Sequence, residues 1–177
     1  MTEITNSEAA VLGILAEKPR YGYEIEKVIE KRRMRYWTEI GLSSIYYVLN
    51  RLEKSGLVKS KRVESPDGKP ARKTYSMTET GNEMIRRKVK QLLSTHVRAI
   101  SPFDLGIAYS RALGKKELRG CLESYLDSLE KHLVRLNELH ESAVKAGRPF
   151  PMIARYERHI EMTAAEKRWI NNFMEKV

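Results

Sequence analysis

A helix followed directly by a β-hairpin is the feature of this sequence that most constrains its fold. The stretch "SSIYYVLNRLEKSG" predicts a helix that begins at Ser43 or Ser44 and ends at Gly56, because glycine takes positive φ freely. Residues 57–63 and 72–77 alternate enough to be two strands, and "DGKP" between them predicts a tight turn. The hairpin therefore follows the helix with no other element between them.

This predicted helix has one apolar and one polar face. Its apolar positions recur at helical spacing and predict a buried stripe: Ile45, Val48, Leu49 and Leu52. Its opposite face carries Ser44, Tyr47, Arg51 and Lys54. A face that is short, polar and cationic suits a DNA major groove, which is about 12 Å wide.

Two helices are predicted before this segment and one after it. Residues 5–8 fit a capping box for a helix that Pro19 stops, and residues 20–34 predict a second helix. Thr78 is the expected N-cap of a helix that continues to about His96. We therefore predict a mainly α chain with a small two-stranded wing. Residues 1–100 would form a winged helix-turn-helix DNA-binding domain, and residues 101–177 a C-terminal domain of long antiparallel helices for dimerisation.

Positive charge is concentrated in the first hundred residues. The chain has 33 Lys and Arg against 23 Asp and Glu, a net charge of +10, and residues 1–100 hold 20 of these cations against 12 anions. The excess is densest around the hairpin, as expected of a protein that binds a polyanion. The single cysteine and the lack of an apolar run near 18–20 residues predict a cytoplasmic protein without a membrane span.

The second half of the chain has the pattern of long packed helices. Residues 115–145 carry apolar side chains three and four apart, and "GRPFP" separates them from a last helix. Both apolar faces are broader than one partner helix uses, so we predict a homodimer with a two-fold interface; a bundle closing over the winged helix is the alternative. The predicted dimerisation residues are Leu122, Tyr125, Leu129, Leu136, Leu139, Ile160, Ile170 and Phe173.

Three stretches resemble the PadR family of bacterial and archaeal transcriptional regulators: "YGYEI", "SSIYYVLNRLEKSGLV" and "GKPARKTYSMTETG". The last is especially similar to the AphA-like branch, whose larger members carry a C-terminal helical dimerisation domain. The resemblance implies a homodimer on a pseudo-palindromic DNA operator, usually as a repressor.

The resemblance also implies which residues face DNA. The helix before the hairpin corresponds to the family's recognition helix, and the hairpin corresponds to its wing. The implied DNA-facing residues on these two elements are Ser43, Ser44, Tyr47, Arg51, Lys69, Arg72 and Lys73. Tyr21 and Tyr23 are implied as further phosphate contacts. Tyr46 lies beside the buried stripe, so a packing role and a DNA contact both stay open, whereas Tyr75 is expected in the core.

No catalytic or metal-binding pattern stands out. The four histidines lack metal-ligand spacing, and no phosphate-binding loop or nucleophile motif is present, so we predict neither an enzyme nor a cofactor. Two other functions stay open. One is a sensor of a small aromatic effector bound between the domains, at Trp37, His159, Met162 and Trp169; the same residues would also suit interdomain packing. The other is a protein-interaction module whose basic half binds an acidic partner.

Overall fold

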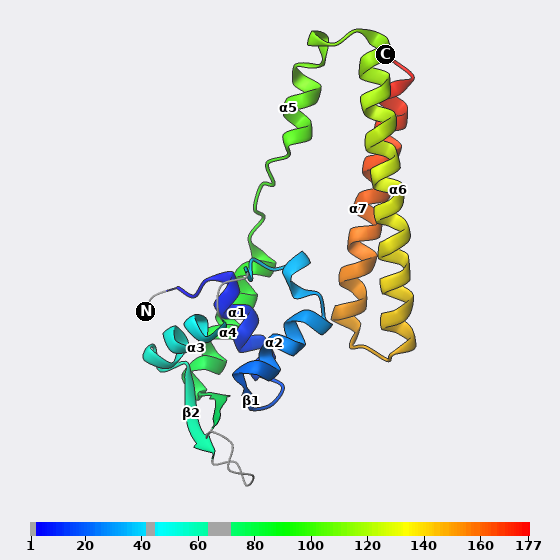
Figure 1. Cartoon of the computed structure of the whole chain (residues 1–177). Coiled ribbons are helices and arrows are strands. Elements are labelled where there is room, and N and C mark those ends of the chain that lie inside the picture. The colour runs from blue at the N-terminus through cyan, green and yellow to red at the C-terminus, as the bar shows by residue number, and fades with distance from the viewer. Residues whose placement is uncertain (1–2, 42–44, 64–71) are drawn as a thin grey trace. The chain divides into compact units, whose positions relative to one another are not determined.

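The computed structural model describes residues 3–41, 45–63 and 72–177, and the chain divides into two compact units, Met1–Arg98 and Ala99–Val177 (Figure 1). The first unit contains α1 (Asn6–Leu15), β1 (Arg20–Tyr21), α2 (Gly22–Lys31), the 3-10 turn η1 (Met34–Tyr36), α3 (Ile45–Lys54), β2 (Val58–Val63), β3 (Arg72–Met77) and α4 (Glu79–Ser94). The second contains α5 (Pro102–Ala108), the 3-10 turn η2 (Ser110–Ala112), α6 (Lys115–Lys145) and α7 (Phe150–Met174).

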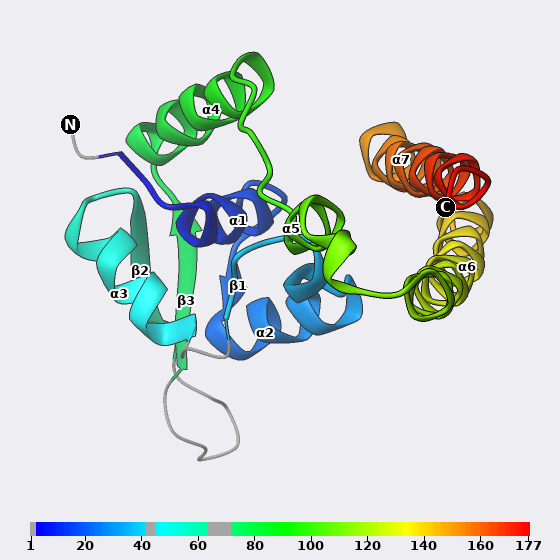
Figure 2. The ribbon, with the colours of Figure 1, turned by 90° about the horizontal axis from the view of Figure 1, so that it is seen from above.

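The first helix begins with the predicted capping box. The backbone N–H of Thr5 donates to Glu8 Oε2 at 2.8 Å, and the backbone N–H of Glu8 donates to Thr5 Oγ1 at 3.2 Å. These bonds satisfy donors that a helix start leaves unpaired. Figure 2 shows α1 between α2 and α4, and it also contacts α3. Its apolar side chains, led by Val11 and Leu12, form the centre of the first core.

The sheet has three antiparallel strands in the order β1-β3-β2, so the prediction of a two-stranded wing was incomplete. We expected Arg20 and Tyr21 to begin the second helix, but they pair with Tyr75 and Thr74 of β3. The physical reason is a cap: the backbone N–H of Tyr21 donates to Glu24 Oε2 at 2.8 Å. The helix therefore starts at Gly22 and leaves the two preceding residues extended.

The fourth helix is fixed to the end of α3 at its first turn. Thr78 caps it as predicted, since Thr78 Oγ1 accepts from the backbone N–H of Gly81 at 3.1 Å. The same hydroxyl donates to the Gly56 carbonyl at 2.7 Å, and Gly56 has φ of +69°. A Cβ on Gly81 would lie 2.1 Å from the Leu57 carbonyl oxygen, so only glycine allows this close approach.

In the second unit, α6 and α7 pack side by side along the predicted apolar seam (Figure 1). Leu122, Leu129, Leu136 and Ile170 are buried within the single chain. Tyr125, Leu139, Ile160 and Phe173 are half-buried. Although both helices are long, no helix in the described residues is apolar enough over a sufficient length to cross a membrane.

Candidate nucleic-acid interface

Helix α3 presents a polar face outward because its apolar face is held in the core. Ile45, Leu49 and Leu52 are buried, and Val48 is half-buried against the same cluster, as the sequence predicted. The exposed side chains, which we call the outward face of α3, are Tyr46, Tyr47, Asn50, Arg51 and Lys54. This face combines hydroxyl, amide and cationic groups, the chemistry that reads base edges and phosphates.

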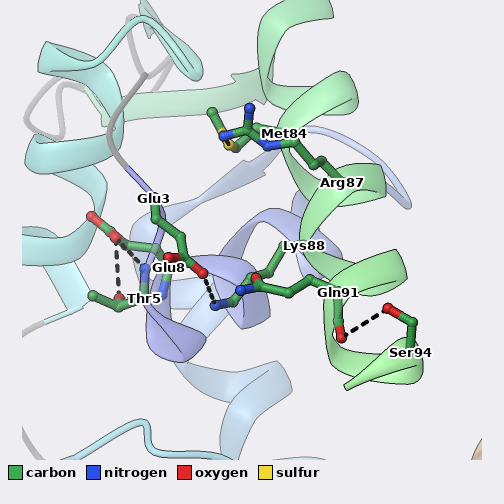
Figure 3. Close-up of polar contacts among 8 residues, drawn as sticks. All are labelled: Glu3, Thr5, Glu8, Met84, Arg87, Lys88, Gln91 and Ser94. Carbon is green, nitrogen blue, oxygen red and sulfur yellow. Dashed lines mark hydrogen bonds and ion pairs between the residues drawn. The ribbon is translucent and has the colours of Figure 1, made fainter.

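Arg51 on this face is oriented by a buried carboxylate. Its Nε lies 3.2 Å from Glu8 Oε1, and the Glu8 side chain is only 7% exposed. The other oxygen of Glu8 accepts from the backbone and the hydroxyl of Thr5 (Figure 3). Since a buried carboxylate needs such partners, one side chain both caps α1 and holds a cation of α3 in place.

The segment before α1 is joined to α4 by a second ion pair. Lys88 Nζ lies 3.1 Å from Glu3 Oε1, and hydrogen bonds from Gln91 and Lys88 lower the pKa of the Glu3 carboxyl (Figure 3). These residues line a cleft of about 380 Å³ with Ile4, Met84 and Arg87. The contacts hold α4 against the segment before α1. Helix α1 packs against both α4 and α3, so these contacts also support the position of α3.

The wing, formed by β2 and β3, carries cations at its described end. Lys61, Arg62, Arg72 and Lys73 are all exposed. Arg62 stands directly opposite Lys73 across the strands, a like-charge pair that destabilises a hairpin by itself. Only part of this cost is offset, because Lys73 Nζ lies 3.7 Å from Glu53 Oε2 of α3. The wing therefore concentrates positive charge that its own folding does not need.

Three of the residues implied by the family resemblance meet beside the wing. The rings of Tyr21 and Tyr23 stack with centroids 5.7 Å apart, and the Arg72 guanidinium lies 5.5 Å from the Tyr23 centroid. The pairing of β1 with β3 brings them together, because Tyr21 faces Thr74 in the register. A cation over an aromatic face is held without being neutralised, so Arg72 keeps its charge for an anionic partner.

Other predicted residues fall into three groups. Ser43, Ser44 and Lys69 lie outside the described residues. Tyr75 is in the core as expected, and burial raises the pKa of its phenol, with a smaller effect from Glu53. Tyr46 is half exposed with its ring edge against the backbone of Gly22, where an added Cβ would lie 2.5 Å away.

The sequence reasoning missed Asn50 and Arg62. Asn50 is exposed three residues after Tyr47, so helical spacing from the predicted polar positions would have found it. Arg62 was counted in the basic excess, but its place opposite Lys73 became visible only from the strand register.

The four predicted effector-pocket residues are divided between the two units. Trp37 packs against the first core, and His159, Met162 and Trp169 belong to α7. Burial lowers the pKa of His159, with further effects from the nearby cations Arg155 and Arg158. Over the described ranges, no group of three or more His, Cys, Asp or Glu side chains could hold a metal ion.

A helix with a polar outward face, beside a basic hairpin and on a layer of helices, defines a winged-helix protein. A model of the transcriptional regulator PadR-like family matches residues 11–87. An uncharacterized protein of Lysinibacillus sphaericus is 32% identical over 84 residues, which are 48% of this chain and 75% of that protein. The chain belongs to the PadR-like family of transcriptional regulators.

Solved structures show how far the fold is shared. Bacillus subtilis PadR in complex with operator DNA aligns with a TM-score of 0.76 at 18% identity, over 96% of this chain and 97% of that one. PadR has also been solved in complex with p-coumaric acid, with a TM-score of 0.78 at 17% identity over 98% and 97% of the chains. The virulence activator AphA of Vibrio cholerae gives 0.72 at 16% identity over 96% of each chain. The fold is thus common to PadR and AphA along nearly the whole chain.

Proposed function

We propose that the chain is a sequence-specific DNA-binding regulator that acts in the cytoplasm as a homodimer on a pseudo-palindromic operator, and that it is a repressor. The observation that carries this proposal is the outward face of α3 beside the basic wing. In the proposal, residues 1–100 bind DNA and residues 101–177 join two copies. PadR, a relative with this fold, has been solved in complex with operator DNA, which supports the proposed partner.

Each part of the interface has a proposed task. Tyr47, Asn50 and Arg51 read base edges in the major groove, and Ser43 and Ser44 contact phosphates before the helix. Lys69, Arg72 and Lys73 neutralise phosphates beside the groove, which releases counterions and makes binding salt-dependent. Tyr21 and Tyr23 support this contact, because the Tyr23 ring lies under Arg72.

Exposed apolar side chains support the proposed dimer. Leu93, in the last turn of α4, is 84% exposed, and Val97, after the end of that helix, is 78% exposed. Leu105 of α5 and Tyr109, which directly follows α5, are also exposed. Large apolar side chains that are left exposed in this way suit a contact with another protein chain. We propose that a second copy covers them together with the half-buried Tyr125, Leu139, Ile160 and Phe173. The buried seam residues Leu122, Leu129, Leu136 and Ile170 would stabilise each subunit.

A small aromatic effector is a further part of the proposal. PadR has been solved with p-coumaric acid, which supports an aromatic effector, and Met162 of α7 offers an exposed thioether surface in this chain. The test is a thermal-shift titration with p-coumaric acid. A rise in melting temperature with concentration supports an effector of this class, and an unchanged melting temperature contradicts it.

The DNA proposal is tested with the region just upstream of the chain's own coding sequence. We expect a retarded band in a gel-shift titration that survives a hundredfold excess of random duplex. Loss of the band to random duplex would contradict sequence-specific binding and leave only the affinity of a basic surface for polyanions. In that case the alternative of a module that binds an acidic protein would gain weight.

A further inference from the structure

A cavity of about 350 Å³ lies in the second unit between α5 and α7. Its lining side chains are Phe103, Asp104, Ile107, Ala108, Glu166 and Trp169. The volume is in the range of sites for small organic molecules. The combination of two aromatic rings and two carboxylates, without a Lys or Arg among the described lining residues, distinguishes this cavity from the basic first unit. We call it the α5–α7 cavity.

The aromatic walls of the cavity are held at a fixed angle. The rings of Phe103 and Trp169 meet edge to face, with centroids 6.3 Å apart and planes at 82°. Phe103 also stacks on Tyr125 of α6 at 4.3 Å, and Trp169 stacks on Phe173 at 5.2 Å. Each wall is therefore supported from behind, while Trp169 remains 49% exposed. Because the two rings contact each other edge to face, a molecule in the cavity meets the surface of Trp169 that this packing leaves exposed.

The charge of the cavity is negative. Within the described part of the chain, neither Asp104 nor Glu166 forms an ion pair, and the neighbouring Lys167 pairs with Glu130. Glu166 Oε1 accepts a hydrogen bond of 2.8 Å from the Tyr125 hydroxyl, which fixes the carboxylate at the cavity wall. Burial, this hydrogen bond and the two carboxylates raise the pKa of Tyr125 to about 12. The phenol therefore stays protonated and neutral, so the charge of the cavity is that of its two carboxylates.

We propose that the α5–α7 cavity binds an organic cation, of the aromatic amine or quaternary ammonium class. The exposed surface of Trp169 contacts the apolar part and attracts the positive charge, as aromatic rings do for ammonium ions. Glu166 and Asp104 neutralise that charge at the rim. An aromatic carboxylate is disfavoured there, because two like charges would face it. The inference concerns a site in the second unit alone and stands whether or not the first unit binds DNA.

Tryptophan fluorescence tests this proposal directly, because the chain has two tryptophans and one of them lines the cavity. In the full chain carrying Trp37→Phe, Trp169 is the sole tryptophan, and excitation at a wavelength that tyrosine does not absorb reports on it alone. We titrate benzyltrimethylammonium, neutral N,N-dimethylbenzamide and anionic phenylacetate at constant ionic strength. The proposal predicts a saturable change in emission with the cation and none with phenylacetate. Equal responses to the three probes would show an apolar site without charge selectivity and overturn it.

Two substitutions and a control locate the charge selectivity. Glu166→Gln keeps an oxygen for the Tyr125 hydroxyl and removes the charge, so it should weaken cation binding about tenfold. Asp104→Asn should weaken cation binding about threefold. Neither variant should change binding of the neutral probe. Glu161→Gln removes another exposed carboxylate of the same helix and should change nothing. An unchanged cation affinity in Glu166→Gln would overturn the proposal. The proposal would also be overturned if no cation bound and the emission of Trp169 were already blue-shifted without a probe. That result would indicate that a second copy of the chain covers this face.

Discussion

Arg51 has one observed contact, with Glu8, and one proposed contact, with DNA, and a substitution affects both. On one side its Nε compensates the buried carboxylate of Glu8, and on the other its exposed part belongs to the outward face of α3. Loss of a partner by a buried carboxylate is costly, because the group stays out of water without compensation. A defect in DNA binding is therefore meaningful only when folding is measured beside it.

We expect Arg51→Ala to weaken binding to the preferred DNA site by about 1–3 kcal/mol and to relax base preference at one position. It should also lower the free energy of unfolding, because Glu8 loses its cation. The matched comparison is Glu8→Gln, which keeps the Arg51 guanidinium but removes the charge that orients it, so it should lower stability and change base preference less than Arg51→Ala does. Fluorescence anisotropy and urea unfolding measure the two effects. A DNA affinity equal to that of the parent chain would remove Arg51 from the proposed interface.

Glu17 gives the first unit an acid-dependent contribution to stability. It forms ion pairs with Arg32 and Arg20, and hydrogen bonding from Arg32 is the main reason that the pKa of its carboxyl is lowered. A lowered pKa in the folded state means that the unfolded chain binds more protons at acid pH. The contribution is therefore present above the ordinary pKa of 4.5 and is lost as pH falls through the lower, folded value.

Glu17→Gln should remove this dependence. We expect the parent chain to lose more stability than the variant as pH falls below 4.5, and the two to differ by a constant amount near neutral pH. Urea unfolding at a series of pH values measures the difference. Because the pair is partly exposed, high salt should reduce it. Parallel pH profiles for the two chains would contradict the assignment.

At the scale of elements, one contact determines how the wing and α4 follow α3. Gly81 lies against the Leu57 carbonyl, which also accepts a hydrogen bond from the backbone N–H of Thr78, so the three elements meet at backbone atoms. Backbone atoms cannot move aside as the end of a side chain can. The T-x-x-G pattern after the wing therefore has a structural explanation that does not involve DNA.

Gly81→Ala should destabilise the chain by about 1–3 kcal/mol, because its Cβ has no room beside Leu57. Gly13→Ala is the matched control, since a Cβ at that exposed position of α1 meets nothing within 4 Å. Alanine favours a helix over glycine, so this variant should gain about 0.5–1 kcal/mol. Thermal and urea unfolding compare the two. Effects of the same sign would contradict the packing described for α4.

The like-charge pair of the wing is expected to lower the stability of the chain and to raise its affinity for DNA. Arg62→Gln removes the like-charge pair with Lys73, so the free energy of unfolding should rise by about 0.2–1 kcal/mol. The same variant should bind all DNA sequences more weakly, with a salt slope smaller by about 0.9. Lys116→Gln, an exposed change in the second unit, is the control for net charge. A steeper or unchanged salt slope in Arg62→Gln would remove this cation from the interface.

For the whole molecule, the sequence was most informative where a periodic pattern was long. The stripe of α3, the seam of α6 and the caps at Thr5 and Thr78 follow from spacing and local hydrogen bonding. Strand β1 was missed because two residues have no period, and its pairing depends on β3, more than fifty positions away. The α5–α7 cavity was missed for the same reason, since it joins side chains of two helices distant in sequence.

The symmetry of the bound DNA tests the central claim most directly. Selection of binding sites from a random duplex pool by the full chain requires no knowledge of the operator. The proposed two-fold dimer predicts enrichment of an inverted repeat whose half-sites lie about one DNA turn apart, roughly 34 Å, or a multiple of it. An unenriched pool would contradict sequence-specific recognition by α3 and the wing, and enrichment of a single half-site would contradict the dimer.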